Sequence, residues 1–269
     1  PREHSMTAVL PPRQRNWPGI LGGLAAFIAL TIATCIPAWG GIEINLGQIA
    51  RNWRNGADRL ALMLSPDWSI LPRTWEPMLE TLAMAVVGAA ISAVIALPLS
   101  LWAARPTNPS TPWRTLVRGI VNVVRAVPDL VYATILVAML GVGALPGVIT
   151  LVLFDVGIVV KLVSEAIDSA DDSYMEAGRA AGGTQTQINR VTALPQTWPA
   201  FASQVIYSLE LNVRISAVLG LVGAGGIGLL IDEVRGFYRY DALSAIVLEL
   251  LIVVIALEIV SVNLRKKLR

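Results

Sequence analysis

The sequence is poor in charge, in cysteine and in histidine. Only 15% of its 269 residues are charged, against about a quarter in soluble globular domains. With one cysteine, Cys35, and one histidine, His4, it can form neither an intrachain disulfide nor a zinc site of Cys and His ligands. A Ser-His-Asp or Cys-His catalytic centre would have to use His4, in a polar tail. The net charge of +2 does not indicate a nucleic-acid partner.

Nucleotide-binding loops are missing or misplaced. No G-x-x-x-x-G-K-[ST] phosphate loop occurs. Gly223, Gly225 and Gly228 have the G-x-G-x-x-G spacing, but the acidic residue about 20 positions further on, Glu249, falls inside an apolar run. We therefore expect no cofactor on this chain. The glycines predict either a turn where backbones approach closely or a re-entrant loop beside a translocation pathway, and the sequence leaves both open.

What the chain has in abundance is apolar residues, 55% of the total. They gather in runs of about 20, the length that crosses a bilayer as a helix. These runs predict an all-α integral membrane protein with about six transmembrane helices. The first run is too long for a signal-peptide core, so we expect it to be retained. The runs are 20–39, 81–104, 120–140, 145–167, 198–222 and 242–262.

Lysine and arginine predict the orientation, because cytoplasmic loops carry an excess of them. With both termini in the cytoplasm, twelve of the 21 fall in inside segments and six in outside segments. Residues 1–18 then form a cytoplasmic tail, whose residues 1–5, ahead of Met6, are expected to be non-native. Residues 264–269 form a basic cytoplasmic tail.

The longest outside segment, residues 41–75, has an amphipathic pattern. Its apolar residues include Ile49, Trp53, Leu60 and Leu64, with arginines between them. This favours a helix at the membrane interface or a surface helix packed on the other spans, and both interpretations stay open.

The inside loop 171–197 is long for a connection and has helix signals. Asp172 or Ser173 is expected to cap a helix over 174–181, and the glycine pair 182–183 is expected to end it.

A second short helix is predicted to begin after Thr184 and to be closed by Pro195. Two short helices held between membrane spans form either a rigid projection for a soluble partner to bind or a plain connector.

This loop resembles the cytoplasmic loop of ABC importer permeases, which reads E-A-A, three residues, G, nine residues, then I-x-L-P. Gly178 replaces the second alanine of that pattern and Thr192 replaces its isoleucine. The residues on the positions that contact the ATPase in this family are Glu176, Ala177, Gly178, Gly182, Thr192, Leu194 and Pro195.

Two further stretches, RAVPDL (125–130) and LNVRISAVLGLVGAGGIG (211–228), resemble segments of the phosphonate and methionine importer permeases. The phosphonate/phosphite branch fits better, because its members commonly have six spans. The likeness covers roughly residues 77–263, with residues 19–76 forming a first span and the outer amphipathic segment. It assigns to a translocation pathway or gate Arg125, Pro128, Asn212, Arg214, Gly223, Gly225 and Gly226.

The resemblance implies the type I ABC importer permease fold in a bacterial inner membrane. The partners implied are a second permease copy in a homodimer, surrounding lipid, two cytosolic ATPase subunits that hold ATP and Mg, and an extracytoplasmic binding protein. The chain itself would catalyse nothing and would carry phosphonate or a related phosphorus oxyanion. The alternatives are a permease for methionine or another small solute, or a stand-alone ion-coupled transporter.

Charged residues inside the spans predict paired or functional groups, because an unpaired charge in the bilayer is destabilising. Arg125/Asp129, Lys161/Glu165 and Glu210/Arg214 have i,i+4 spacing. Arg214 lies furthest from a span end and is expected to steady the oxyanion by charge-assisted hydrogen bonds. Three carboxylates have no partner on their own helix and are expected to meet cations across helices or across the dimer: Asp155, Glu249 and Glu258.

Overall fold

The computed structural model describes residues 17–34 and 46–268, and all regular structure in them is helical. Residues 1–16 of the predicted tail, Cys35 and the end of the first apolar run lie outside the described residues, whereas Trp17 and Pro18, predicted to belong to the tail, begin α1. The helices are α1 (Trp17–Thr34), α2 (Leu46–Met63), η2 (Trp68–Ile70), α3 (Leu71–Ala103), α4 (Thr111–Ala126), α5 (Asp129–Leu140), α6 (Ala144–Asp168), α7 (Ser173–Ala180), α8 (Gln185–Ile188), η3 (Asn189–Ala193), α9 (Leu194–Leu219), η4 (Gly220–Val222), α10 (Ile227–Gly236) and α11 (Tyr240–Lys267).

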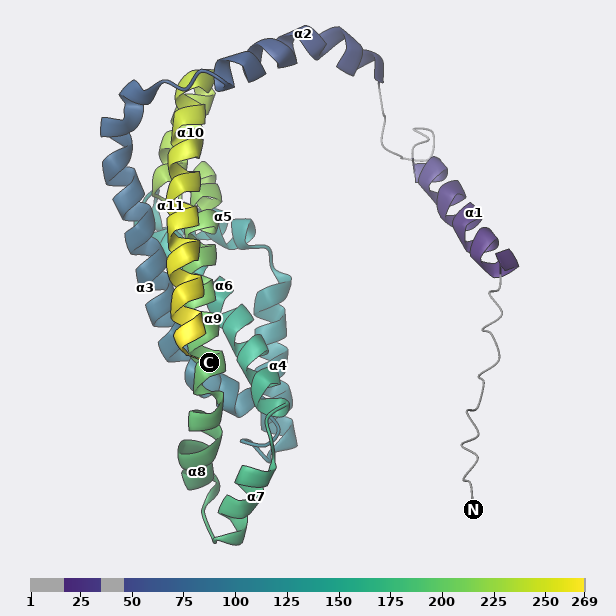
Figure 1. The fold of residues 1–269 in the computed structure, drawn as a ribbon, viewed down its shortest axis with the longest axis vertical. Coiled ribbons are helices and arrows are strands. Elements are labelled where there is room, and N and C mark those ends of the chain that lie inside the picture. The colour runs from purple at the N-terminus through teal and green to yellow at the C-terminus, as the bar shows by residue number, and fades with distance from the viewer. Residues whose placement is uncertain (1–16, 35–45, 269) are drawn as a thin grey trace, which may run out of the picture. The chain divides into compact units, whose positions relative to one another are not determined.

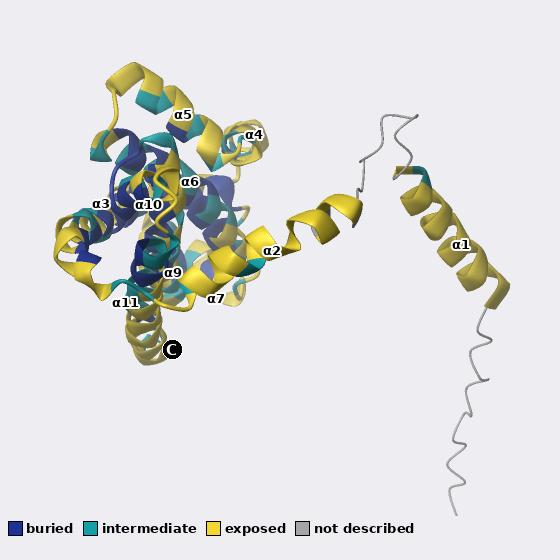
Figure 2. Cartoon of the chain, turned by 90° about the horizontal axis from the view of Figure 1, so that it is seen from above, coloured by how far each residue is buried: buried dark blue, intermediate teal, exposed yellow. Residues whose placement is uncertain are grey.

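The chain divides into two compact units, Pro1–Asp58 and Arg59–Arg269. In the first unit α1 has no buried residue, and Figure 2 shows it exposed along its length. An apolar helix of this length left uncovered by protein suits contact with lipid. The predicted helix within 41–75 is confirmed as α2, and Trp53 on it is 68% exposed. Its place at a membrane interface stays a prediction.

The second unit is a helical bundle built around α3, α6 and α9 (Figure 1). The buried residues of α3 from its middle to its end are small and recur every three or four positions, so they form one stripe along the helix. Small side chains let neighbouring helices approach closely, as is common where helices pack in membranes. The stripe consists of Ala85, Gly88, Ala89, Ser92, Ala96, Ser100 and Ala103.

Five helices in the described residues are long and apolar enough to cross a membrane, and a sixth span results if the bent pair α4–α5 is counted as one. The predicted single helix over 120–140 is wrong, because α4 and α5 meet at an angle of 82°. Val127 and Pro128 between them have extended backbones. Proline lacks an N–H and disfavours a helical conformation in the residue before it, so the helix breaks there.

Two features lie at opposite ends of this bundle (Figure 1). At one end α7 and α8 project beyond α4 and α6. At the other, α9 turns through η4 into α10. We call residues 173–195 the coupling segment and residues 220–228 the glycine segment.

Candidate coupling segment and pathway residues

The coupling segment has a small core of its own. Met175 of α7 is fully buried, and it clusters with Ile188 and Ala193. Gly178 lies against this core, since a Cβ there would come within 3.2 Å of Ile188 Cγ1. An alanine at position 178, as in the family pattern, would therefore require Ile188 to shift by a few tenths of an ångström. The segment therefore has packed helices of its own, and whether it is a binding projection or a helical connector stays open.

The predicted end of the first helix is confirmed. Gly182 has φ +77°, which glycine adopts without steric strain. The Gly183 N–H donates to the Gly178 carbonyl at 3.1 Å, and the Gly182 N–H donates to the Arg179 carbonyl at 2.9 Å. These two bonds form a Schellman motif, which pairs the last carbonyls of α7.

The predicted N-cap position of α7 is confirmed at Asp172, but its side chain makes no capping hydrogen bond. Asp171 Oδ1 instead accepts a hydrogen bond from the Ser173 N–H at 3.0 Å. Hydrogen bonds from Ser173 lower the pKa of the Asp171 carboxyl from its ordinary value. The Asp171 side chain thus bonds the N–H two residues further along and pairs a donor of the first turn of α7.

The second helix begins at Thr184 as predicted, and the Thr184 N–H donates to Gln187 Oε1 at 2.8 Å. It does not close at Pro195. Residues Asn189–Ala193 form a π turn, in which the Leu194 N–H donates to the Asn189 carbonyl. This wider turn carries the helix past a proline that lacks an N–H. The coupling segment is therefore joined to α9 without a break.

The motif residues lie partly at the surface. Glu176, Ala177, Gly182 and Pro195 are exposed, whereas Gly178, Thr192 and Leu194 are half-buried. Two large apolar side chains beside them are also exposed, Tyr174 at 61% and Val191 at 71%. The surface thus combines one carboxylate with apolar area, which is suited to binding a protein partner. Whether these residues contact an ATPase stays a prediction.

Arg125 and Pro128, two of the residues predicted to line a pathway, meet at one cavity. It measures about 240 Å³ and lies at the break between α4 and α5, facing α6, with Asp129 and Tyr132 also in its wall. Arg125 passes over Gly157, where a Cβ would come within 2.6 Å of Arg125 Cγ. Because α4 ends before Asp129, the predicted Arg125/Asp129 pair is absent among the described ion pairs, and the Asp129 carboxylate accepts from the Leu130 N–H.

Asn212 lies elsewhere, fully buried between α3, α6 and α9. Its Nδ2 donates to Asp155 Oδ2 at 2.7 Å, and the Ser92 hydroxyl donates to the same oxygen at 3.3 Å. The expectation that Asp155 meets a cation is wrong within this chain's described residues, where its partners are neutral. Asn212 thus ties three helices together in this conformation, and its predicted pathway role stays untested.

Arg214 pairs with Glu210 as predicted. Glu210 also accepts from Arg265 Nη2 at 3.4 Å, so one buried carboxylate lies between two arginines of α9 and α11. The Arg214 side chain is 45% exposed, and the excess positive charge of this triad leaves an arginine able to attract an anion. Contact with a transported anion stays a prediction.

The remaining intramembrane charges give a mixed outcome. Lys161 and Glu165 pair as predicted, at 2.5 Å. Glu249 and Glu258 have no cation partner among the described residues, and Glu249 Oε2 is buried without a hydrogen bond there.

The glycine segment brings two helix backbones into direct contact. A Cβ on Gly228 would lie 2.2 Å from the Ala217 carbonyl oxygen, and a Cβ on Gly220 would lie 2.4 Å from the Gly228 Cα. Any larger residue would push α10 away from α9. The structure thus contains the close backbone approach that was one of the two interpretations of these glycines.

Three glycines of this segment have left-handed backbones, Gly223 (φ +92°), Gly225 (φ +85°) and Gly226 (φ +69°). Thr81 of α3 holds the turn in place, because its fully buried hydroxyl oxygen accepts from the Ile227 N–H at 2.8 Å. The gate role assigned to the three glycines remains a prediction.

Comparison with known proteins decides the family. Residues 96–269, more than half of the chain, match the family described as the inner membrane component of binding-protein-dependent transport systems. The chain belongs to this family. It is a multi-pass inner-membrane permease component. The cytoplasmic orientation of its termini stays a prediction.

Individual relatives of this permease component agree. It is 41% identical over 217 residues to the phosphite transport system permease protein PtxC of Stutzerimonas stutzeri, covering 79% of this chain and 78% of that one. It is 33% identical over 241 residues to the phosphate-import permease protein PhnE of Mycolicibacterium smegmatis, covering 87% of this chain but only 44% of the relative.

A solved structure of the MetNI methionine ABC transporter in an inward-facing conformation has the same fold. The TM-score is 0.68 at 24% identity, over 76% of this chain and 99% of the other. This likeness establishes the type I importer permease fold predicted from the motifs and carries no information on substrate.

Sequence reasoning missed several polar residues that organise this permease. Thr81 and Ser92 lie inside apolar runs, and Arg118 and Asp168 lie 50 positions apart. Each has its partner on another helix, so no local sequence pattern predicts these contacts.

Proposed function

We propose that this permease forms the membrane pathway of an ATP-driven importer for a phosphorus oxyanion such as phosphite, phosphonate or phosphate. A second copy would complete the pathway, cytosolic ATPase subunits would bind the coupling segment, and an extracytoplasmic binding protein would deliver the substrate. ATP and its Mg²⁺ would be held by the ATPase, so this chain would contribute the pathway and the moving lever.

The observation that carries the coupling role is the coupling segment itself. It folds on its own core and projects at one end of the bundle. It presents the exposed Glu176 beside Tyr174 and Val191. Because a helical turn joins it to α9 without interruption, a force applied by a partner would be transmitted into the bundle rather than absorbed by a flexible loop.

The substrate class is supported by the relatives, whose names specify phosphite and phosphate, and by the cavity at the α4–α5 break. That cavity of about 240 Å³ exceeds the roughly 30 Å³ that a water occupies in the liquid, so a small oxyanion fits. Arg125 has no carboxylate partner among the described ion pairs and would offer it charge-assisted hydrogen bonds.

The coupling role is tested by co-purification. In Glu176→Lys, reversal of an exposed charge should weaken recovery of the ATPase about tenfold, the scale of losing one interface salt bridge with its partner left unpaired. Asp58→Lys is the control, since it makes the same charge change at an exposed position of α2, outside the coupling segment, and should leave recovery unchanged. Equal recovery of the ATPase with both variants would contradict the assignment of Glu176.

The substrate class is tested by uptake in proteoliposomes containing the permease, its ATPase and its binding protein. Phosphite, methylphosphonate and phosphate should enter in an ATP-dependent manner, and methionine should not. Arg125→Gln should slow oxyanion uptake while ATPase recovery stays at the wild-type level. Uptake of methionine instead, or uptake that persists without the ATPase, would favour one of the alternative functions.

A further inference from the structure

Residues 104–110, which we call the linking loop, connect α3 to α4 and lie between the coupling segment and the body of the bundle. Thr107 and Asn108 in this loop are almost fully buried. Buried polar groups need hydrogen-bond partners, and this loop finds them on both of its sides.

On one side the linking loop accepts hydrogen bonds from side chains of the coupling segment. Gln185 Nε2 donates to the Pro106 carbonyl at 3.0 Å, and Asn189 Nδ2 donates to the Thr107 carbonyl at 2.8 Å. Arg179 Nη2 makes a longer bond of 3.4 Å to the Pro106 carbonyl. Gln185 and Asn189 also bond to each other at 2.8 Å, so the two donors hold each other in position.

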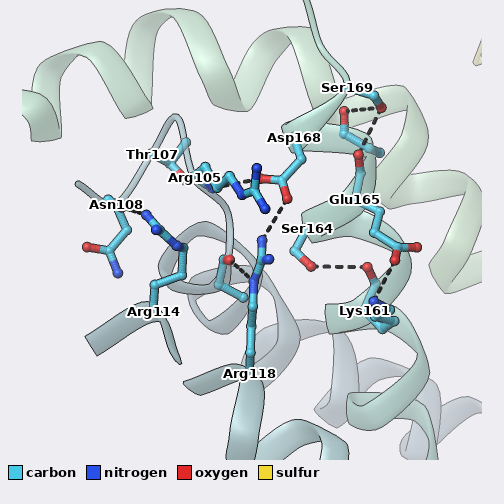
Figure 3. Close-up of polar contacts among 12 residues, drawn as sticks. Arg105, Thr107, Asn108, Arg114, Arg118, Lys161, Ser164, Glu165, Asp168 and Ser169 are labelled. Atoms are coloured by element: carbon cyan, nitrogen blue, oxygen red, sulfur yellow. Dashed lines mark hydrogen bonds and ion pairs between the residues drawn. The ribbon is translucent and has the colours of Figure 1, made fainter. Parts of the chain in front are cut away.

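On the other side the linking loop is fixed to α4 and α6 (Figure 3). The Arg105 N–H donates to Asp168 Oδ1 at 2.7 Å. Arg118 donates to the Ala103 carbonyl at 2.6 Å through Nε and pairs with Asp168 Oδ2 at 2.6 Å through Nη2. Asp168 thus binds the loop and α4 at once from the last turn of α6.

The linking loop is also bonded to the two helices that it joins. The Thr107 hydroxyl donates to the Leu101 carbonyl at 2.6 Å, and Asn108 Nδ2 donates to the Trp102 carbonyl at 2.7 Å. Arg114 of α4 donates to the Asn108 carbonyl at 3.0 Å. A loop bonded in this way moves as one piece with the ends of α3 and α4.

We propose that the linking loop acts as a relay, which carries movement of the coupling segment to α3 and α4. Gln185 and Asn189 are the positioning residues that join the coupling segment to the loop. The chain itself connects the coupling segment only to α6 and α9. The linking loop supplies the connection to the other two helices. This inference rests on the proposed function, because it assumes that an ATPase moves the coupling segment.

The test replaces the side-chain amides of Gln185 and Asn189, which donate to the loop, by carboxylates of the same size, which only accept. In the double variant Gln185→Glu with Asn189→Asp, carboxylate oxygens face the loop carbonyls in place of N–H groups. Recovery of the ATPase should stay at the wild-type level, while substrate transported per ATP hydrolysed should fall about tenfold, within the range by which substitutions between two sites change their coupling.

Gln187→Glu is the matched control. Gln187 lies in the same helical turn, but its Oε1 accepts from Thr184, a function that a carboxylate keeps. This variant adds negative charge without removing a donor to the loop, so its transport per ATP should stay within about twofold of wild type. Equal loss in the control and the double variant would overturn the relay.

A reversible cross-link provides a readout that a merely structural role would not change. Pro106→Cys with Gln185→Cys, in a chain carrying Cys35→Ser, should couple poorly when reduced, because the donor is lost. A short bifunctional thiosulfonate reagent should restore coupling, and reductant should abolish it again. If cross-linking instead stops transport, the two elements move apart in the cycle and the relay is wrong.

The two proposals fail differently. Wild-type chain that neither recovers an ATPase nor shows ATP-dependent uptake overturns the proposed function and the relay with it. ATP-dependent uptake by wild type, together with normal coupling in the double variant, overturns the relay alone.

Discussion

The two ends of the bundle are joined by different kinds of contact. At the coupling end, side-chain amides of Gln185 and Asn189 bond to main-chain carbonyls of the linking loop. At the glycine end, α9 and α10 meet backbone to backbone, with a would-be Cβ of Gly228 only 2.2 Å from a carbonyl oxygen. These contacts lie at opposite ends of α9, because the coupling segment precedes that helix and the glycine segment follows it.

The difference indicates how each end can be disrupted by substitution. A side-chain donor at the coupling end can be exchanged for an acceptor of the same size, and a buried carbonyl left without its donor then costs about 1–3 kcal/mol. Backbones in direct contact admit no added atom, because packed interiors do not deform continuously. The coupling end therefore depends on single hydrogen bonds, whereas the glycine end depends on close packing of two helices.

The largest expected effect on stability is at the glycine end. Gly228→Ala places a methyl group 2.2 Å from the Ala217 carbonyl oxygen and 2.6 Å from the Gly220 Cα. Such overpacking should destabilise the protein by about 3 kcal/mol, seen as a lower midpoint of thermal unfolding in detergent.

Gly236→Ala is the control for that variant. Gly236 is the last residue of α10, and a Cβ there meets no atom within 4 Å. Alanine should be neutral or stabilising by up to about 1 kcal/mol. Similar destabilisation by both variants would mean that close backbone approach at Gly228 is not the cause of the loss.

An intermediate effect is expected at the coupling end. Asp168→Asn weakens the half-buried bonds to Arg118 and to the Arg105 N–H and should destabilise by about 2 kcal/mol, as for hydrogen bonds to charged groups. Arg235→Gln breaks the exposed pair with Asp232, which lies outside the candidate spans, and should change stability by less than about 0.5 kcal/mol. Equal unfolding midpoints for the two variants would show that the Asp168 contacts do not fasten the linking loop.

The smallest effect concerns pH at the glycine end, where Asp67 precedes η2. Hydrogen bonds from Ser69, and then the charge of Arg239, lower the pKa of the Asp67 carboxyl below its ordinary value of 3.8. The folded state therefore favours the ionised form. Its stabilising contribution is fully present above pH 3.8 and is lost as the pH falls through the lowered value. Asp67→Asn should flatten the fall of the unfolding midpoint below about pH 4, and an unchanged slope would contradict this assignment.

Some elements could be predicted because their signals are local. Gly182 ends α7 in the left-handed conformation that only glycine adopts readily, and Thr184 starts the next helix. The break at Pro128 was also within reach, because the proline rule applies there, but the apolar run concealed it. Pro195 shows the opposite error, since the same rule predicted an end that the π turn avoids.

The family motif and the lengths of the apolar runs were enough to determine the fold class, the approximate number of spans and the place of the coupling segment. These properties depend on residues close together in the chain. Only the tertiary structure decided which polar groups meet. Asp155 joins Asn212 from 57 positions away, and Gln185 joins the linking loop from 79 positions away. Helix packing sets such pairings, because it alone brings distant faces to the same depth and within hydrogen-bond distance.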